Sequence, residues 1–315
     1  MIQVIKSIDA HAGGAAVRLL VEGMPTPRGS SMAHKGQWMQ RHADHLRRSL
    51  LREPRGHEAL VGTMLTEAVS PGAHAGIVFM DGAGYPALSG GAVLAATTIA
   101  LERRLIDAPD PARLVFDTAA GTVHAEARVH AGGERRRVDS VALTTVPCYV
   151  ARGGHTLRVG TRELRVDLAF GGLLYAIVDT EAVGIGLSGA TLPELLRLAS
   201  HIRDAAGAID GVVFTGPPLD PEAHLRSIVV PGGRVDRSPS VTGTSAVMAV
   251  LDAMGLLDEA TPFVHESLAG TLLRGTIARR TEVDGTPAIV PRIEGSAWIT
   301  GEHTFLIDED DPLNQ

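Results

Sequence analysis

The sequence predicts an α/β fold of two similar lobes, in each of which a β-sheet surrounds a central helix. Two segments are apolar on nearly every side, residues 89–102 and 240–255, and their first residues lie 151 positions apart in a chain of 315 residues. A helix that is apolar all round is a buried helix. Strand-like sequence precedes each segment, and β-rich sequence follows it at residues 113–129 and 268–280. Because the pattern recurs after half the chain, we expect two copies of one unit.

The first lobe begins with strands, which alternate apolar and polar residues or are rich in β-branched residues. They are expected at residues 3–10, 16–22, 60–68 and 75–80. The first two are joined by a turn at Gly13-Gly14. A helix is expected over residues 36–52, because apolar residues recur there at helical spacing and Pro54 ends the helix. Ser89 is expected to be the N-cap of the first buried helix.

The second lobe repeats this opening. Further strands are expected within residues 156–179, around Gly171-Gly172, and an amphipathic helix over residues 193–207. We therefore expect the first lobe to comprise residues 1–155 plus 297–315 and the second lobe residues 156–296. Two chain crossings between the lobes would let them hinge. The acidic run at residues 308–311 is expected to be a solvated tail.

Composition indicates an ordinary globular protein, with 44% hydrophobic and 21% charged residues. An aromatic share of only 3% requires an aliphatic core that is rich in alanine. The net charge of −7 and a pI near 6.0 provide no basic surface for nucleic acid or anionic lipid. No apolar stretch reaches the roughly 20 residues that span a bilayer, and the N-terminus lacks a signal-peptide layout. We expect a cytoplasmic protein with a small-molecule partner, and no nucleic-acid or membrane partner.

Several cofactor and metal sites lack support in the sequence. Cys148 is the only cysteine, which excludes an intrachain disulfide, a thiolate metal cluster and a pair of cysteine bases. The histidines are dispersed without ligand spacing. Residues 184–189 match the dinucleotide pattern GxGxxG, but that pattern has to open a helix directly, and Pro193 starts the helix late. No Walker A, HExxH or GxSxG motif occurs. We expect neither a metal nor a cofactor.

The starts of the two buried helices are the most informative feature for function. Gly90-Gly91 in one helix and residues 242–245 in the other would expose unpaired backbone N–H groups where the helix dipole is positive. Such groups bind carboxylates. The alternative, two helix starts softened by glycine with no ligand, stays open on spacing alone.

Two segments carry a resemblance to a known family. Asp236-Arg-Ser-Pro-Ser240-Val-Thr-Gly-Thr-Ser-Ala resembles the DRSPCGTGTSA motif of the proline racemase family, and Gly84-Tyr-Pro-Ala-Leu-Ser89-Gly-Gly resembles its GY-x-x-MCGH motif. Further matching segments extend over nearly the whole chain, at residues 8–14, 53–57, 167–172, 266–271 and 295–302. On these segments the chain is identified as a member of the family.

The resemblance implies the fold of diaminopimelate epimerase, with two β-rich lobes around central helices and an active site in the cleft between them. Proline racemases, hydroxyproline 2-epimerases and trans-3-hydroxy-L-proline dehydratases of this family take the α-proton of a cyclic amino acid, without a cofactor. The first two use one cysteine from each lobe. The implied ligand is a proline-like amino acid, and a homodimer is one assembly open to the chain. The positions implied to bind the ligand are Gly90, Gly91, Asp236, Thr242, Gly243 and Thr244, with Ser245 beside them; Asp236 contacts the ring nitrogen in the family.

Both catalytic cysteine positions of the family pattern hold serine, Ser89 and Ser240. A thiol has a reference pKa of about 8.5, which falls further at a helix N-terminus. A serine alcohol is a far weaker acid, and a helix dipole contributes only about 0.3 to 2 kcal/mol. Family dehydratases and some epimerases resemble each other in carrying serine or threonine at the first position while keeping cysteine at the second. Here the second position is changed as well.

Other departures reduce the polar groups of the expected site. Gly91 stands where the family has histidine, Ala92 and Val241 where it has glycine, and Leu173 where a polar residue is more frequent. These departures affect proton transfer more than binding of an amino acid.

Two functions therefore stand side by side. In the first, the protein binds a proline-like amino acid and lacks racemase, epimerase and dehydratase activity, or performs other chemistry. In the second, it is an active cofactor-independent epimerase or dehydratase in which Ser89 and Ser240 act with an assisting base. Asp236 is the candidate base, and His57 comes after it because a loop histidine is more often bonded within its loop.

Overall fold

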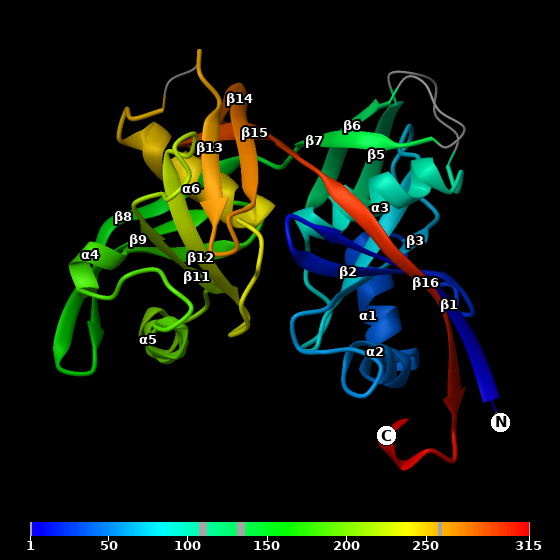
Figure 1. Ribbon diagram of the computed structural model, residues 1–315. Helices are drawn as coiled ribbons and strands as arrows, with labels where there is room; N and C mark the ends of the chain where they lie inside the picture. Colours follow the sequence, from blue (N-terminus) through cyan, green and yellow to red (C-terminus); the bar gives the residue numbers. More distant parts are fainter. Residues whose placement is uncertain (1, 107–111, 131–135, 258–259, 315) are drawn as a thin grey trace. The chain divides into compact units, whose positions relative to one another are not determined.

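The computed structural model describes residues 2–106, 112–130, 136–257 and 260–314, and the chain divides into two compact units (Figure 1). Unit 1 consists of Met1–Leu143 and Gly295–Gln315, and unit 2 consists of Thr144–Glu294. The predicted α/β fold with two similar lobes is confirmed. The predicted boundary between residues 155 and 156 lies inside strand β8 (Cys148–Val159), all of which belongs to unit 2.

The strands of unit 1 follow one another in the order β7-β6-β5-β4-β3-β2-β1-β16. Their bounds are β1 (Ile2–Ala12), β2 (Ala15–Glu22), β3 (Val61–Thr66), β4 (Ala75–Met80), β5 (Ala112–Thr118), β6 (Gly121–Val129), β7 (Val138–Thr144) and β16 (Ala297–Asp308). The pairs β2–β3 and β4–β5 are parallel. The last strand of the chain, β16, pairs with the first, β1, along its whole length, from Ile2 opposite Asp308 to Ala12 opposite Ala297.

The strands of unit 2 close into an eight-stranded barrel. They follow the order β14-β13-β12-β11-β10-β9-β8-β15, and β14 also pairs with β15, which closes the ring. Besides β8, their bounds are β9 (Arg162–Phe170), β10 (Leu174–Asp179), β11 (Gly211–Gly216), β12 (Leu225–Pro231), β13 (Phe263–Ser267), β14 (Leu272–Val283) and β15 (Thr286–Gly295). The helices of this unit are α4 (Thr180–Val183), α5 (Leu192–Ala206) and α6 (Val241–Ala253).

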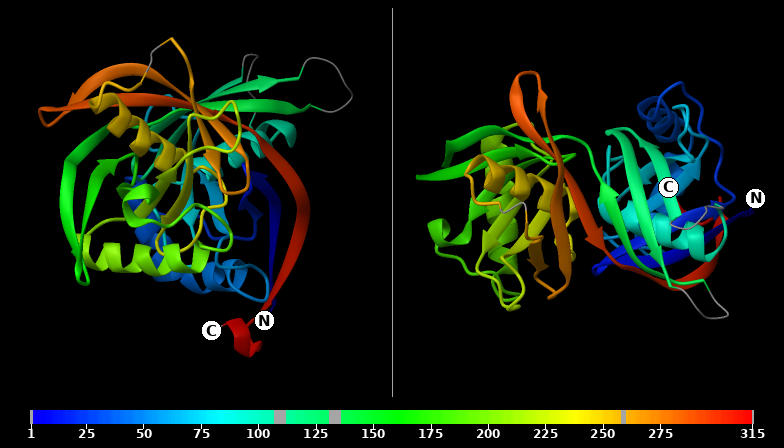
Figure 2. Two further views of the ribbon diagram at one scale, coloured as in Figure 1. Left: turned by 60° about the vertical axis from the view of Figure 1, so that its left-hand side comes forward. Right: turned by 90° about the horizontal axis from the view of Figure 1, so that it is seen from above.

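Each unit has one helix in its core, as the sequence predicts. Helix α3 (Gly90–Glu102) contacts β1, β2, β3, β6 and β16 of unit 1, and α6 contacts β8, β9, β10 and β14 of unit 2. Residues 92–101 of α3 and 241–250 of α6 are buried without interruption. Figure 2 shows α6 lying among the strands of its own unit. Because alanine, threonine and valine dominate both helices, the surrounding strands can approach them closely.

The single helix predicted over residues 36–52 is two helices, α1 (Met32–His42) and α2 (Asp44–Leu51). Helix α1 begins earlier because the Ser31 side chain accepts a hydrogen bond from the backbone N–H of His34, which caps the helix. The chain then leaves helical geometry at Ala43, with φ of −139°. Asp44 opens the second helix and pairs with Arg47 at 2.6 Å. Helical spacing alone did not reveal this break.

The repeat extends to individual hydrogen bonds. In unit 1 the His74 backbone N–H donates to the Val115 carbonyl (2.8 Å), and the Val115 N–H donates to Nδ1 of His74 (3.0 Å). In unit 2 His224 and Val264 make the same two bonds at the same two distances. A ring nitrogen that accepts from an N–H carries no proton, so both rings are in the Nε2–H form when neutral. The two units therefore share contacts as well as topology.

A second repeated contact uses an acid on a strand. The Asp117 carboxylate accepts the backbone N–H groups of Val69 (2.8 Å) and Ser70 (2.7 Å), and the Glu266 carboxylate accepts those of Leu219 (2.7 Å) and Asp220 (3.1 Å). Burial of the Asp117 carboxyl raises its pKa, but the donated N–H bonds outweigh this effect, and the pKa lies below its usual range.

The glycines of the GxGxxG match do not open a helix. Gly184 ends the short helix α4 with φ of 69°, and an irregular segment separates it from the start of α5 at Leu192. The structure therefore gives the dinucleotide interpretation no support. Across the described ranges, no helix is long and apolar enough to cross a membrane.

Gly171 positions the start of α6. A side-chain carbon at Gly171 would collide with the Thr242 carbonyl oxygen and the Ala246 amide nitrogen, both in the first turns of α6. The Gly171 N–H donates to the Leu173 carbonyl at 2.9 Å, which closes the turn between β9 and β10. The absence of a side chain lets this turn lie directly on the helix backbone.

Replacing Gly171 with alanine is therefore expected to lower the free energy of unfolding by about 1–3 kcal/mol, the usual effect of overpacking. Urea unfolding followed by circular dichroism measures this change. Gly186→Ala is the matched control, because a side-chain carbon there meets nothing within 4 Å. Equal stability of the two variants would show that the turn does not rest on the helix as described.

Candidate functional site

The start of α3 in unit 1 carries the first of the two predicted catalytic residues. Ser89 is the N-cap, with φ of −136° and ψ of 102°, and its side chain makes no capping hydrogen bond. Its carbonyl accepts the Val93 N–H at 3.0 Å, the first bond of the helix. No partner is found among the described residues for the N–H groups of Gly90 and Gly91, as expected for a helix start. This helix start therefore presents a hydroxyl without a capping bond and two N–H groups without a partner among the described residues.

Gly91 has space around it. A side-chain carbon at this position would come no closer than 3.9 Å to Ala12 and 4.0 Å to Ala15, which is ordinary van der Waals distance. A side chain at position 91 would therefore fit without displacing these two residues.

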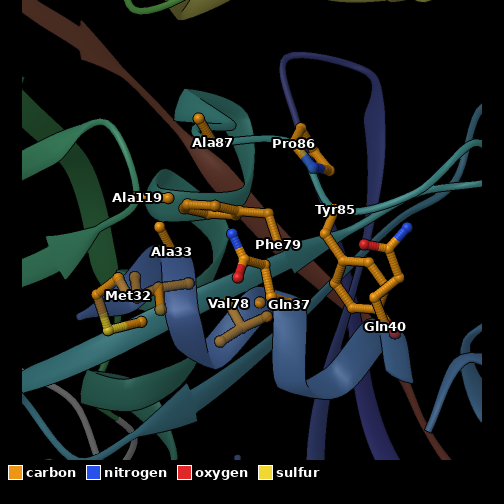
Figure 3. Close-up of a pocket in the computed structure, with 12 residues that line it drawn as sticks. Met32, Ala33, Gln37, Gln40, Val78, Phe79, Tyr85, Pro86, Ala87 and Ala119 are labelled. Carbon is orange, nitrogen blue, oxygen red and sulfur yellow. The ribbon is translucent and has the colours of Figure 1, made fainter. Parts of the chain in front are cut away.

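A cavity of about 210 Å³ lies beside the segment that leads to Ser89 (Figure 3). Tyr85, Pro86 and Ala87 of that segment form one side, and residues of α1, including Gln37 and Gln40, form another. Burial raises the pKa of Tyr85 to about 12, and the Arg47 guanidinium lies 5.7 Å from the ring centre. Tyr85 is therefore a neutral wall of this cavity at physiological pH.

The start of α6 in unit 2 is built differently. Ser240 is buried, and its oxygen Oγ accepts the Gly243 N–H at 3.3 Å, so the side chain caps the helix. Its carbonyl accepts the Thr244 N–H (2.8 Å), and its own N–H donates to Oγ of Ser238 (3.0 Å). With φ of 60°, Ser240 occupies a backbone region that side chains rarely adopt. Such strain persists where the surroundings fix it, and it is concentrated at functional sites.

A line of hydroxyl groups runs from Ser240 into the barrel. Thr242 Oγ1 lies 3.2 Å from Ser240 Oγ and 2.8 Å from the Tyr175 hydroxyl, and all three residues are buried. Burial raises the pKa of Tyr175 above its usual value, and the charge of Asp236 raises it further. The sequence analysis missed Tyr175. Its one signal in the sequence was that it is one of only three tyrosines and lies in a segment expected to form a strand.

Asp236 is half-buried beside this line of hydroxyls. Its carboxylate accepts both the N–H (2.9 Å) and the hydroxyl (2.8 Å) of Ser238. Burial is the largest effect on this carboxyl and raises its pKa, whereas the Ser238 bonds, Arg234 and the Ser240 hydroxyl lower it. Asp236, Ser238 and Ser240 are therefore tied together, and Asp236 lies within the influence of the Ser240 hydroxyl. His57, the second candidate base, lies in a loop of unit 1 between α2 and β3.

Thr244 points its side chain into the core. Its Oγ1 lies 2.8 Å from Nδ1 of His265 and donates to the Pro239 carbonyl at 3.3 Å. The Thr244 hydroxyl has one proton, so His265 Nδ1 is the donor when that proton goes to Pro239 and the acceptor when it goes to the ring. Nε2 has no partner in the described part of the chain. At the start of α6, the N–H groups for which no partner is found among those residues belong to Val241 and Thr242.

The single cysteine is not available for chemistry. Cys148 is fully buried, and its thiol donates to the Val146 carbonyl at 3.1 Å. Burial raises its pKa to about 12, so the thiol stays protonated at physiological pH.

Comparison with known proteins gives consistent matches over nearly the whole chain. The chain matches the family model described as proline racemase over residues 7–315. It is 35% identical over 326 residues to the proline racemase of Clostridioides difficile, covering 98% of this chain and 96% of that protein. It is 31% identical to the trans-3-hydroxy-L-proline dehydratase of Bacillus cereus, with coverage of 99% and 97%. A crystal structure of a hydroxyproline epimerase from Agrobacterium vitis, with bound trans-4-hydroxy-L-proline, gives a TM-score of 0.88 at 29% identity and coverage of 99% and 94%.

The two serines are expected to differ in their contribution to stability. Ser240→Ala removes a helix cap and is expected to lower the free energy of unfolding by about 1 kcal/mol. Ser89→Ala removes a hydroxyl that caps nothing, and its effect is expected to stay within about 0.5 kcal/mol. Urea unfolding of both variants measures the difference. A loss at Ser89 as large as that at Ser240 would contradict the assigned roles.

His265 is expected to make the protein less stable in acid. Burial lowers its pKa to about 3, against 6.5 for the free side chain. Below about pH 6.5 the unfolded chain therefore binds a proton that the folded chain does not, so stability falls as the pH falls toward 3 and is unaffected above 6.5. At pH 5 the loss amounts to about 2 kcal/mol. Unfolding free energies between pH 4 and 8 measure the slope, and His265→Asn should flatten it; an unchanged slope in that variant would exclude His265 as the source.

Proposed function

Because this chain belongs to the proline racemase family, we propose that it binds a proline- or hydroxyproline-like amino acid and carries little or no racemase, epimerase or dehydratase activity. Asp236 holds the ring nitrogen, and the N–H groups at the start of α6 hold the carboxylate. In unit 1, Ser89, Gly90 and Gly91 offer a separate set of hydrogen-bond donors at the start of α3. The relative with bound trans-4-hydroxy-L-proline supports this ligand class.

The charges at the site suit such a ligand. A cyclic amino acid carries a positive nitrogen and a negative carboxylate at neutral pH. The pKa of Asp236 is raised by burial, and a carboxylate in that state is stabilised when a cation approaches. The N–H groups of Val241 and Thr242 lie at the positive end of the α6 dipole, where an anion is favoured.

The proposal that catalysis is weak rests on the state of the Ser240 hydroxyl. Its oxygen already accepts the Gly243 N–H, so one lone pair is engaged in capping the helix. An oxygen engaged in this way is a poorer base, and the alcohol is a far weaker acid than a thiol. The helix dipole contributes at most about 2 kcal/mol, which does not make up the difference.

A second candidate function is an active epimerase or dehydratase, and one observation favours it. The Ser240 hydroxyl is among the groups that lower the pKa of Asp236, and Ser238 bonds to both residues. In this version Ser240 Oγ takes the α-proton of the ligand while its own proton passes to Asp236. Asp236 is then the assisting base that an alcohol requires.

Proton NMR in D₂O distinguishes the two functions. The purified protein is mixed with proline and with the 3- and 4-hydroxyprolines of both configurations, and saturation transfer reports binding while the α-proton signal reports catalysis. We expect binding without loss of the α-proton, and weaker binding in Asp236→Asn. Loss of the α-proton signal would establish the second function, and absence of binding to every compound would contradict the ligand class.

The double variant Ser89→Cys, Ser240→Cys is the control for the chemistry. It restores both thiols of the family pattern, and α-proton exchange is expected to appear on the ligand that binds. A variant that binds but remains inert would show that Gly91 or Val241 also matters for proton transfer. The cytoplasmic location and the homodimer stay predictions.

A further inference from the structure

We propose that Tyr175 is a positioning residue that acts on position 240 through Thr242 and lowers the proton affinity of the side chain there. The inference rests on the proposed function only in taking position 240 as a group that meets the ligand. Tyr175 lies on β10 and is fully buried, so it can affect a ligand only through other side chains.

Either atom of each pair can be the donor, and one consistent direction for the line runs from Tyr175 to Thr242 to Ser240. The Tyr175 side chain is fully buried, and its hydroxyl lies 2.8 Å from Thr242 Oγ1. Because its pKa is raised, Tyr175 keeps its proton throughout the physiological range and can donate it to Thr242. Thr242, having accepted that bond, can direct its own proton toward Ser240 Oγ at 3.2 Å.

Two donors therefore converge on one atom. Ser240 Oγ accepts the Gly243 N–H and faces the Thr242 hydroxyl, an arrangement that stabilises negative charge on that atom. Hydrogen bonds in a chain polarise one another, so a bond donated by Tyr175 makes the Thr242 hydroxyl a stronger donor. A thiol placed at position 240 would lose its proton more easily for the same reason.

The charged groups around this line of hydroxyls raise some pKa values and lower others. The Asp236 carboxylate interacts with the Ser240 hydroxyl and opposes a second negative charge there. The positive charge of Arg234 lowers the pKa of Asp236. Asp236 and Asp210 both raise the pKa of Tyr175, which helps to keep the phenol protonated. None of these groups is changed by removing the Tyr175 hydroxyl, so its effect can be measured separately.

The test is the pKa of a thiol introduced by Ser240→Cys. Iodoacetamide labelling between pH 5 and 10, followed by mass spectrometry of the peptide that contains position 240, gives this pKa without any ligand. Cys148 does not interfere, because its side chain is fully enclosed whereas Ser240 is 6% exposed, and because it lies on a different peptide. Adding Tyr175→Phe removes one oxygen atom, and the pKa at position 240 is expected to rise by about half a unit. At a pH below the pKa, labelling then slows about threefold.

Thr242 provides a second test in case Tyr175→Phe disturbs the barrel. In the Ser240→Cys background, Thr242→Val keeps the shape but removes the middle hydroxyl, and the thiol pKa is expected to rise by about one unit. Thr242→Ser keeps the hydroxyl and should leave the pKa unchanged. Combining Tyr175→Phe with Thr242→Val should add nothing to Thr242→Val alone, because both act along one line.

Tyr149→Phe is the matched control. Tyr149 also belongs to unit 2, and its ring packs against Phe170 away from this line of hydroxyls. A shift as large in Tyr149→Phe as in Tyr175→Phe would overturn the proposal, and so would an unchanged thiol pKa in folded Tyr175→Phe and Thr242→Val variants. Because labelling needs no ligand, a protein that fails to bind proline analogues can still show the shift, so this inference and the proposed function fail separately.

Discussion

The buried start of α6 is the constraint on which the arrangement of unit 2 depends. A helix that begins inside a barrel brings N–H groups into the core, where each one requires a partner or a ligand. Ser240 supplies partners for two of them, through its side chain to Gly243 and through its carbonyl to Thr244. The strained backbone of Ser240 is stable because Ser238 holds its N–H and Gly171 leaves room for the helix backbone.

A serine has different roles at the two helix starts. Sulfur accepts hydrogen bonds weakly, so a serine oxygen is the better cap, while a thiol is the better acid. At Ser240 the oxygen caps the helix, which links this side chain to stability. At Ser89 the side chain makes no capping bond. The pair of serines is therefore symmetric in sequence but not in structure.

Much of this could be predicted from the sequence, for identifiable reasons. The two buried helices were predictable because all-round apolar segments are rare, and Ser89 is the N-cap of the first, as predicted. The break at Ala43 was not predictable, because the apolar spacing continues through it. The side chain of Thr244 turns toward His265, and the Tyr175 hydroxyl reaches Thr242, through contacts between residues 21 and 67 positions apart. Motif and periodicity describe local sequence, so such distant pairs were outside their reach.

The pairing of β1 with β16 bears on how the chain is made. Unit 2 is one continuous stretch, Thr144–Glu294, so all its strands can pair once that stretch has emerged from the ribosome. Unit 1 is different, because its first strand pairs with its last, Ile2 opposite Asp308. At a synthesis rate of about 5–20 residues per second, β16 is completed roughly 15 to 60 seconds after β1. During translation the nascent chain thus carries an unpaired strand edge, a surface that invites association with other chains or with a chaperone.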